Sequence, residues 1–135
     1  MITPVLRVRD VDLSLQFYTQ LLGFKGEGGL PGADGKTVYA EAYMGDAKLM
    51  ISRRTSTAHC IGELYIDLPD AIDIRRFHAF LRAREVPMCE DLREEIWGDC
   101  AFTITDLDGN RLTFAQRVRR AVIPGAQLLA FEHIA

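Results

Sequence analysis

Few side chains in this sequence have the type and spacing that metal binding or nucleophilic catalysis requires. The three histidines, His59, His78 and His133, stand far apart, and no two of them share a strand or one helical turn. A divalent transition metal needs several imidazole, thiolate or carboxylate ligands that converge on one point. No Ser-His-Asp or Cys-His arrangement can be placed either. The sequence therefore predicts no catalytic residue.

A glycine-rich stretch at residues 26–35 is the one segment with the composition of a phosphate-binding loop. It ends in Gly35-Lys36-Thr37, which superficially matches the end of a Walker loop. Such a loop must open a helix whose N-terminus points at the phosphate. The residues that follow, from Val38 to Tyr43, are typical of a strand instead. We therefore expect a connector or a hairpin here and no nucleotide site.

The composition narrows the range of partners. The chain has 135 residues, is 48% hydrophobic and 26% charged, and carries a formal net charge of −3, all of which is ordinary for a globular protein. Its basic cluster, at Arg117, Arg119 and Arg120, has no aromatic residue interleaved with it. Nucleic acid is therefore not an expected partner. No membrane is expected either, because no window approaches the ~20 apolar residues of a membrane span.

The cysteines and the first residues indicate the compartment. Cys60, Cys89 and Cys100 are odd in number and none are at C-x-x-C spacing. This pattern argues against a disulfide framework and against a cysteine zinc site. Residues 1–10 lack the apolar core of a signal peptide. We expect a cytoplasmic protein with free thiols.

Hydrophobic periodicity predicts the elements that must position any site. Leu13, Phe17 and Leu21 form one helical stripe behind an N-cap at Asp10 or Asp12. Alternation and turn signals predict strands at residues 3–9, 39–43, 47–53, 64–68, 101–105 and 111–116.

The second predicted helix repeats the first. It begins at an N-cap, Asp70, and its stripe consists of Ile74, Phe77 and Leu81. Asp10 falls on Asp70 when the chain is shifted onto itself, and the two helical stripes coincide. Such a repeat indicates a duplicated strand–helix–strands unit. We expect one domain over residues 1–118, with modules at about 1–57 and 61–118, and a C-terminal extension at 119–135.

The order of elements and several local motifs resemble one known superfamily. The motifs are residues 4–10 running into 14–18 and 22–24, and then Trp97-Gly98, Phe102 and residues 106–110. Over residues 2–117 the chain resembles the vicinal oxygen chelate superfamily, which includes glyoxalase I, extradiol dioxygenases, fosfomycin-resistance enzymes and bleomycin-resistance proteins. The resemblance implies an α+β fold of two tandem βαβββ modules. They would form a curved mixed sheet with a cavity on its concave face and helices on its outer face. Many members carry Arg at the position of Cys100 and Pro at that of Leu107.

Strand alternation sorts the side chains onto two faces. One face is apolar throughout, as a helix-covered face requires: Leu6, Val8, Leu49, Ile51, Leu64, Ile66, Leu68, Leu112 and Phe114. The other face is mostly polar: Thr3, Val5, Arg7, Lys48, Met50, Ser52, Glu63, Tyr65, Asp67, Arg111 and Thr113. Alternation alone leaves open whether solvent simply wets this second face. The resemblance favours a cavity there.

The resemblance also marks where a metal would lie. Metal-dependent members place their ligands at four equivalent strand positions, which in this chain are Thr3, Met50, Glu63 and Thr113. Only Glu63 among these is a suitable ligand for a catalytic divalent cation. We therefore expect neither a metal nor another cofactor. One alternative stays open, because a loop could fold His59 over the cavity beside Glu63.

The predicted ligand-binding residues are Arg7, Met50, Glu63, Tyr65, Trp97 and Thr113. Trp97 either stacks on a flat ligand or belongs to the core. Among the strand tyrosines we expect only Tyr65 on the cavity face, and a slip of one residue would reverse this. Glu63, as a lone carboxylate on a cavity wall, would favour a cationic ligand or act as a base.

The resulting expectation is a metal-free protein that binds a small organic ligand, similar to the bleomycin-resistance branch, with antibiotic sequestration as one form. A homodimer is implied by the family, whose sites are often built across two chains. The alternative is a metal-dependent glyoxalase-like isomerase, lyase or dioxygenase with a displaced ligand set that includes His59 and Glu63.

Overall fold

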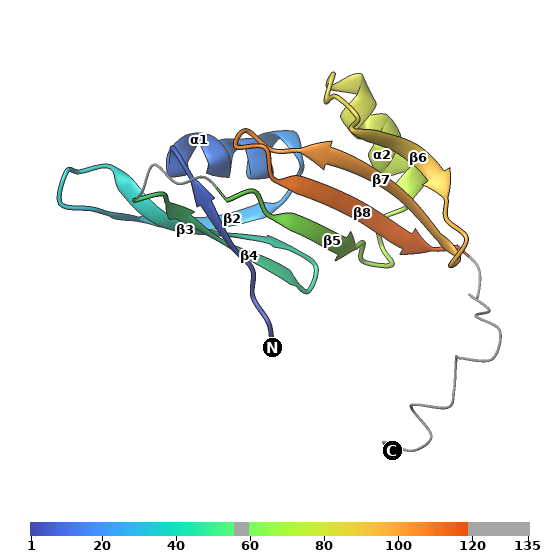
Figure 1. Ribbon diagram of the computed structural model, residues 1–135, viewed down its shortest axis with the longest axis horizontal. Helices are drawn as coiled ribbons and strands as arrows, with labels where there is room; N and C mark the ends of the chain where they lie inside the picture. Colours follow the sequence, from blue (N-terminus) through green and yellow to red (C-terminus); the bar gives the residue numbers. More distant parts are fainter. Residues whose placement is uncertain (56–59, 119–135) are drawn as a thin grey trace, which may run out of the picture.

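The computed structural model describes residues 1–55 and 60–118. Its elements form two modules of the same design, module 1 over residues 5–53 and module 2 over residues 63–117 (Figure 1). Each module contains a strand, a helix and three further strands. The predicted α+β fold of tandem βαβββ modules is therefore confirmed. Among the described residues, no helix is long and apolar enough to cross a membrane.

Module 1 starts with β1 (Val5–Val8) and α1 (Val11–Gln16), and α1 continues into a π-helical turn, η1 (Phe17–Leu21). Three strands complete it: β2 (Lys25–Pro31), β3 (Thr37–Met44) and β4 (Ala47–Arg53). The sheet order is β1-β4-β3-β2, with β1 parallel to β4 and the other pairs antiparallel. The glycine-rich stretch thus forms most of β2 and its turn, which confirms the predicted hairpin.

Module 2 repeats this pattern. Its elements are β5 (Glu63–Asp67), α2 (Ile74–Ala83), β6 (Glu90–Glu94), β7 (Asp99–Thr105) and β8 (Arg111–Arg117). The sheet order is β5-β8-β7-β6, again with one parallel pair, β5 and β8. The registers also correspond, because Val5 pairs with Met50 in module 1 and Tyr65 pairs with Thr113 in module 2. β1 and β5 are the inner edge strands of two separate sheets.

Two local predictions need correction. The N-cap of α2 is Asp73, whose side chain accepts a hydrogen bond of 3.1 Å from the Arg76 N–H, rather than Asp70. Asp70 lies in a turn closed by a hydrogen bond from Ile72 N–H to the Pro69 carbonyl, so the helix cannot start there. Alternation also missed β6, whose sequence EDLRE has a single apolar residue. An edge strand with charged side chains buries too little to show alternation.

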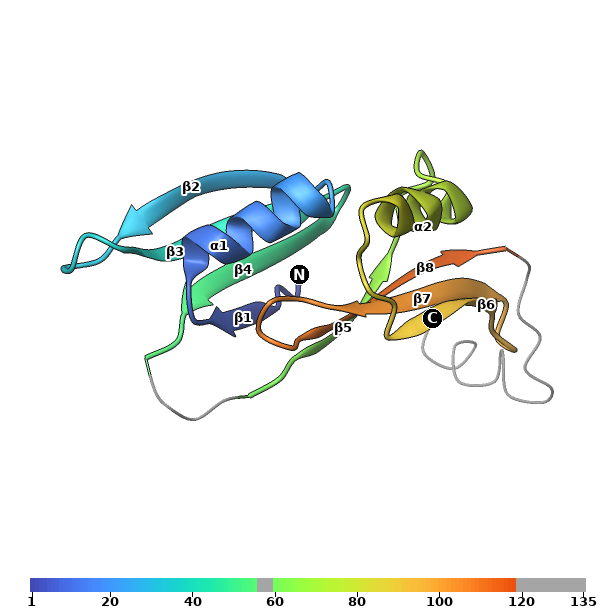
Figure 2. The same ribbon diagram turned by 90° about the horizontal axis from the view of Figure 1, so that it is seen from above.

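The core lies between the sheets and the two helices, which are on the same side of both sheets (Figures 1 and 2). The residues predicted to face the helices are all buried except Leu64, which is half-buried. Phe114 of β8 joins the modules, because its ring centroid lies 6.4 Å from that of Phe24 in module 1 and 5.0 Å from that of Phe77 on α2. Within the described residues, the two modules therefore share one hydrophobic core.

A buried polar network, here called the latch, also connects the modules. The Tyr18 hydroxyl donates to the Asp106 carboxylate at 2.7 Å, and Ser14 Oγ donates to Asp108 at 3.4 Å. Asn110 Nδ2 donates to Asp106 at 2.9 Å within the β7–β8 turn. Burial and the neighbouring Asp106 carboxylate raise the pKa of Tyr18. The latch therefore fixes α1 and η1 of module 1 against the β7–β8 turn of module 2.

Candidate functional site

Each sheet has one face that points away from the helices, here called the open face. Cross-strand partners lie on the same face of a sheet. In module 1 the open face carries Arg7, Tyr39, Glu41, Tyr43, Lys48, Met50 and Ser52. In module 2 it carries Glu63, Tyr65, Asp99, Thr103, Arg111, Thr113 and Arg117. All the predicted ligand-binding residues of the strands are on these two faces.

The open face of module 2 holds a pocket of about 280 Å³. Three of the predicted ligand-binding residues line it: Tyr65, Trp97 and Thr113. The rest of the lining comes from β6, β7 and the loop between them: Glu90, Asp91, Arg93, Glu95, Ala101, Phe102 and Thr103. Tyr65 is 49% exposed and Trp97 is 41% exposed. Trp97 is thus a surface residue at the pocket and not part of the core.

A buried carboxylate, that of Asp99, fixes this side of the pocket. Asp99 Oδ2 accepts hydrogen bonds from the Tyr65 hydroxyl at 2.6 Å and from Trp97 Nε1 at 3.2 Å. Asp99 Oδ1 accepts one from Arg117 Nε at 2.8 Å. Burial alone would raise the pKa of Asp99, but the hydrogen bonds from Tyr65 and Arg117 outweigh it and lower the pKa. Asp99 is therefore ionised at neutral pH. Burial and the hydrogen bond between Tyr65 and Asp99 raise the pKa of Tyr65 to about 12.

Glu63 lies beside the pocket in an ion-paired group. Arg111 Nε lies 3.0 Å from Glu63 Oε1, and the same guanidinium is 3.4 Å from the Glu90 carboxylate. The hydroxyls of Thr103 and Thr113 are hydrogen-bonded at 2.7 Å. Glu63 is therefore not the lone carboxylate that the sequence predicted, because Arg111 pairs with it and with Glu90.

Module 1 has its own polar cluster, which the sequence analysis missed. Glu41 Oε1 accepts a hydrogen bond of 2.7 Å from the Tyr39 hydroxyl, and Glu41 Oε2 accepts one from the Tyr43 hydroxyl. Lys48 Nζ lies 3.4 Å from the same carboxylate. Hydrogen bonding to Glu41 raises the pKa of Tyr43 to about 12. The prediction that only Tyr65 among the strand tyrosines faces the cavity side is therefore wrong.

The other two predicted residues, Arg7 and Met50, also belong to module 1. Arg7 donates a hydrogen bond of 2.9 Å to Ser52 Oγ on the adjacent strand. Met50 is half-buried between its partners on β1 and β3. Neither residue lines the module 2 pocket. A single chain thus brings together Tyr65, Trp97 and Thr113, with Glu63 nearby, but leaves Arg7 and Met50 on the other module.

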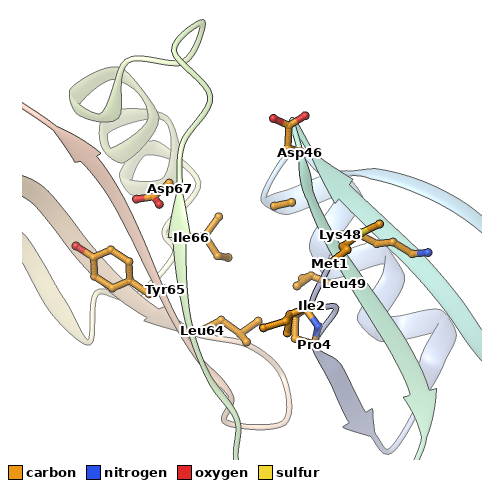
Figure 3. Close-up of a pocket in the computed structure, with 11 residues that line it drawn as sticks. Met1, Ile2, Pro4, Asp46, Lys48, Leu49, Leu64, Tyr65, Ile66 and Asp67 are labelled. Carbon is orange, nitrogen blue, oxygen red and sulfur yellow. The ribbon is translucent and has the colours of Figure 1, made fainter. Parts of the chain in front are cut away.

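A groove of about 340 Å³ lies between β5 on one side and the residues before β1 with the start of β4 on the other (Figure 3). Leu64 of β5 points across it toward Ile2 and Pro4, and Ile66 points into it farther along the strand, whereas Tyr65 points away toward the open face (Figure 3). The groove is lined in part by apolar side chains, such as Leu49, Leu64 and Ile66. It lies between the two modules and therefore forms part of their boundary.

The turn between β3 and β4 contacts module 2 near this groove. Gly45 has a φ of +57°, and a Cβ atom placed on it would lie 2.5 Å from Pro69 Cγ. Both the backbone conformation and this contact favour glycine at position 45. The β3–β4 turn therefore packs against Pro69 of module 2 without a side chain at position 45.

Comparison with known families decides the relationship. Residues 2–114 match the family model described as the Glyoxalase/Bleomycin resistance protein/Dioxygenase superfamily. The chain belongs to this superfamily. Among curated proteins, none has a sequence that matches this chain significantly. The predicted resemblance to the vicinal oxygen chelate superfamily is thereby confirmed.

Solved structures of superfamily members agree with the fold. TioX from Micromonospora sp. ML1 has a TM-score of 0.73 at 18% identity, with 87% of this chain and 98% of that chain covered. A glyoxalase-related enzyme from Clostridium phytofermentans has a TM-score of 0.70 at 17% identity, with 87% and 94% covered. Lactoylglutathione lyase from Agrobacterium tumefaciens has 0.68 at 19%, with 86% and 92% covered. At these identities the likeness establishes the fold alone.

The superfamily's metal positions do not fit a divalent cation in this chain. Thr3 and Thr113 offer only hydroxyls, Met50 offers a thioether, and the Glu63 carboxylate is engaged by Arg111. Catalytic divalent metals prefer imidazole or carboxylate ligands. Elsewhere in residues 1–55 and 60–118, no three His, Cys, Asp or Glu side chains converge as metal ligands would. His59, the suggested companion of Glu63, lies outside the described residues, as does the extension at 119–135.

Proposed function

We propose that this member of the superfamily binds a small organic molecule on its open faces without a metal ion. The observation that carries the proposal is the donor set at the four family positions, where the sole carboxylate, Glu63, is ion-paired with Arg111. Next to it lies a pocket lined by two exposed aromatic side chains, Tyr65 and Trp97. Large aromatic surfaces with a few fixed polar groups are typical of ligand pockets.

The chemistry of the pocket supports binding rather than turnover. Its carboxylates are engaged: Glu90 with Arg111, Asp91 with His78 and Glu95 with Arg93. A general base needs a pKa near the working pH, and the pKa of Asp91 lies below its usual value because of hydrogen bonds from the Leu92 N–H and His78. We propose sequestration of an organic compound, an antibiotic being one form, as the role of the protein.

The proposed active form is a homodimer in the cytoplasm. β1 and β5 are edge strands in the described chain, and Val5 on β1 is 45% exposed. Exposed edge strands are usually covered by another element or another chain. The second copy would also supply the open face of module 1, which carries Arg7 and Met50. The exposed free thiols of Cys60 and Cys89 support a reducing compartment.

Equilibrium titration tests the proposed function. A panel of aromatic and cationic antibiotics, including bleomycin, is titrated by calorimetry with and without a chelator. We expect at least one compound to bind with the same affinity in both conditions. Loss of all binding after chelation, or a stoichiometric transition metal in the purified protein, would contradict metal-free binding. Failure of the entire panel would contradict the proposed ligand class.

Sedimentation velocity tests the dimer. We expect a concentration-dependent dimer for the full chain, and the same dimer for a version that ends at residue 118 if the edge strands form the interface. Replacing Val5 on the open edge with Lys should shift the equilibrium toward monomer, because like charges would then repel across a symmetric contact. A monomer at all concentrations would contradict this part of the proposal.

A further inference from the structure

The hydrogen bonds around Asp99 connect three segments that are distant in sequence. Asp99 begins β7, Tyr65 comes from the middle of β5, and Arg117 ends β8. Trp97 precedes β7 in a loop that is itself held by the hydrogen bond from Val118 N–H to the Gly98 carbonyl at 3.0 Å. One buried carboxylate therefore determines where the indole and the phenol lie relative to each other.

The two rings are held by their polar ends. The Trp97 indole N–H lies 3.2 Å from Asp99 Oδ2 and also 3.2 Å from the Tyr65 hydroxyl oxygen. The Tyr65 hydroxyl donates its own hydrogen to Asp99 at 2.6 Å. Each ring is thus fixed at one edge, and both residues, Trp97 with 41% and Tyr65 with 49% of its surface exposed, line the pocket.

Asp99 itself is not a ligand contact. Its side chain is 8% exposed, and its two oxygens already accept three hydrogen bonds. Any effect of Asp99 on binding must therefore pass through the two rings. Fixing side chains before the ligand arrives removes the ordering cost that binding would otherwise carry.

We propose that Asp99 is a positioning residue that holds Trp97 and Tyr65 as a preformed aromatic platform, and that the module 2 pocket takes a flat aromatic ring system. This inference rests on the proposed function and narrows its ligand class. A flat ring system gains the full contact area of a fixed indole face, whereas a puckered ring of the same size touches it at few atoms.

The single tryptophan of the chain gives a direct readout. In a 1H–15N correlation spectrum, the indole N–H of Trp97 is the sole signal of its kind. We expect 2-naphthol to shift this signal through its ring current and to bind at least tenfold more tightly than decahydro-2-naphthol, which has the same skeleton without a flat ring. Equal affinities for the two probes would overturn the proposed ligand class.

Variants separate positioning from charge. Asp99→Asn should move the indole N–H signal in the ligand-free protein and weaken 2-naphthol binding by roughly tenfold, because the rings lose their charged acceptor. Asp67→Asn is the matched control: it removes an exposed carboxylate on the same strand as Tyr65, outside the pocket lining, and it should leave both readouts unchanged. An equal loss in both variants would show that net charge matters, and would overturn the positioning role.

A second variant covers the case in which Asp99→Asn does not fold. Tyr65→Phe keeps the ring and removes the hydroxyl that bridges Trp97 and Asp99. We expect a shifted indole signal and a roughly threefold loss of 2-naphthol affinity with the melting temperature little changed. An unshifted signal and unchanged affinity would overturn the platform. If compounds bind in the antibiotic titration but these probes do not discriminate, the proposed function stands and this inference fails.

Discussion

The two modules have the same strand order and register but different open faces. In module 1 the carboxylate of Glu41 gathers Tyr39 and Tyr43, which are neighbours on its own strand. In module 2 the carboxylate of Asp99 gathers Tyr65 and Trp97 from separate segments and lies next to a pocket. The module 1 cluster thus stays within one strand, whereas the module 2 cluster joins separate segments beside a pocket.

The helix-facing sides do not show this divergence. Leu6 and Ile66 are both buried, as are Ile51 and Phe114 at another pair of equivalent positions. Such positions must be apolar because each lies under a helix, and a polar replacement without a partner would cost several kcal/mol. The open faces carry no such restriction, so a duplicated fold can specialise there while its core stays apolar.

The first prediction tests whether the two modules share one core. Phe114→Ala removes the ring that lies between Phe24 and Phe77. We expect the free energy of unfolding to fall by about 3–5 kcal/mol. Urea unfolding followed by circular dichroism should still give one transition. Two transitions, with module 1 unfolding as in the wild type, would show that the modules are independently stable.

The second prediction concerns the latch. Tyr18→Phe leaves the Asp106 carboxylate without its hydroxyl donor in a buried site. The free energy of unfolding should fall by about 1–3 kcal/mol, because a buried hydrogen bond to a carboxylate is lost while Asn110 still donates to Asp106. Tyr43→Phe serves as the control on the half-exposed face and should have a much smaller effect. Equal losses in urea titrations would remove the distinction between buried and open tyrosines.

The third prediction asks which module carries the ligand. Trp97→Leu should weaken binding of any compound found in the titration panel by about tenfold, since a central aromatic contact is lost. Ile96→Ala, a change at the adjacent side chain that is 89% exposed and does not line the pocket, should have no effect. Tyr43→Leu in module 1 should have a smaller effect than Trp97→Leu. The reverse order in calorimetry would move the site to module 1.

The smallest expected effect concerns alkaline pH. The pKa values of Tyr43 and Tyr65 are each raised to about 12, the former mainly by the hydrogen bond to Glu41 and the latter mainly by burial. Their contribution to stability is thus complete below pH 10, the ordinary value, and is lost as the pH rises toward 12. Phenolate absorbance should show a late-titrating group that disappears in Tyr43→Phe and another that disappears in Tyr65→Phe. Ionisation of both at pH 10 would refute these shifts.

Much of the fold could be predicted because apolar residues alternate along a strand, or form a stripe on a helix, when one side of that element is buried. The strand at residues 47–53 and the stripe of Ile74, Phe77 and Leu81 appear in the structure as expected. β6 could not be found this way, since a charged edge strand buries almost nothing. The N-cap was misplaced at Asp70 because Asp70 and Asp73 both precede the helix, and the sequence alone does not distinguish between two such capping residues.

The candidate site was only partly predictable. Tyr65 and Thr113 follow from alternation, and Trp97 follows from the family motif. The sequence does contain the alternation that puts Tyr39, Glu41 and Tyr43 on one face, with Ala40 and Ala42 on the other. Asp99 gives no comparable signal, because its partners meet only after three segments have folded together.

The contact between Gly45 and Pro69 is one of the points at which the two halves of the molecule touch. A methyl group at position 45 has no room beside the proline ring, so Gly45→Ala would act as a wedge of one carbon atom at the end of the groove. A larger residue would add to the strain that the positive φ of position 45 already imposes on any side chain. A substitution in this turn would therefore act on the packing of the two halves from a position that no ligand needs to touch.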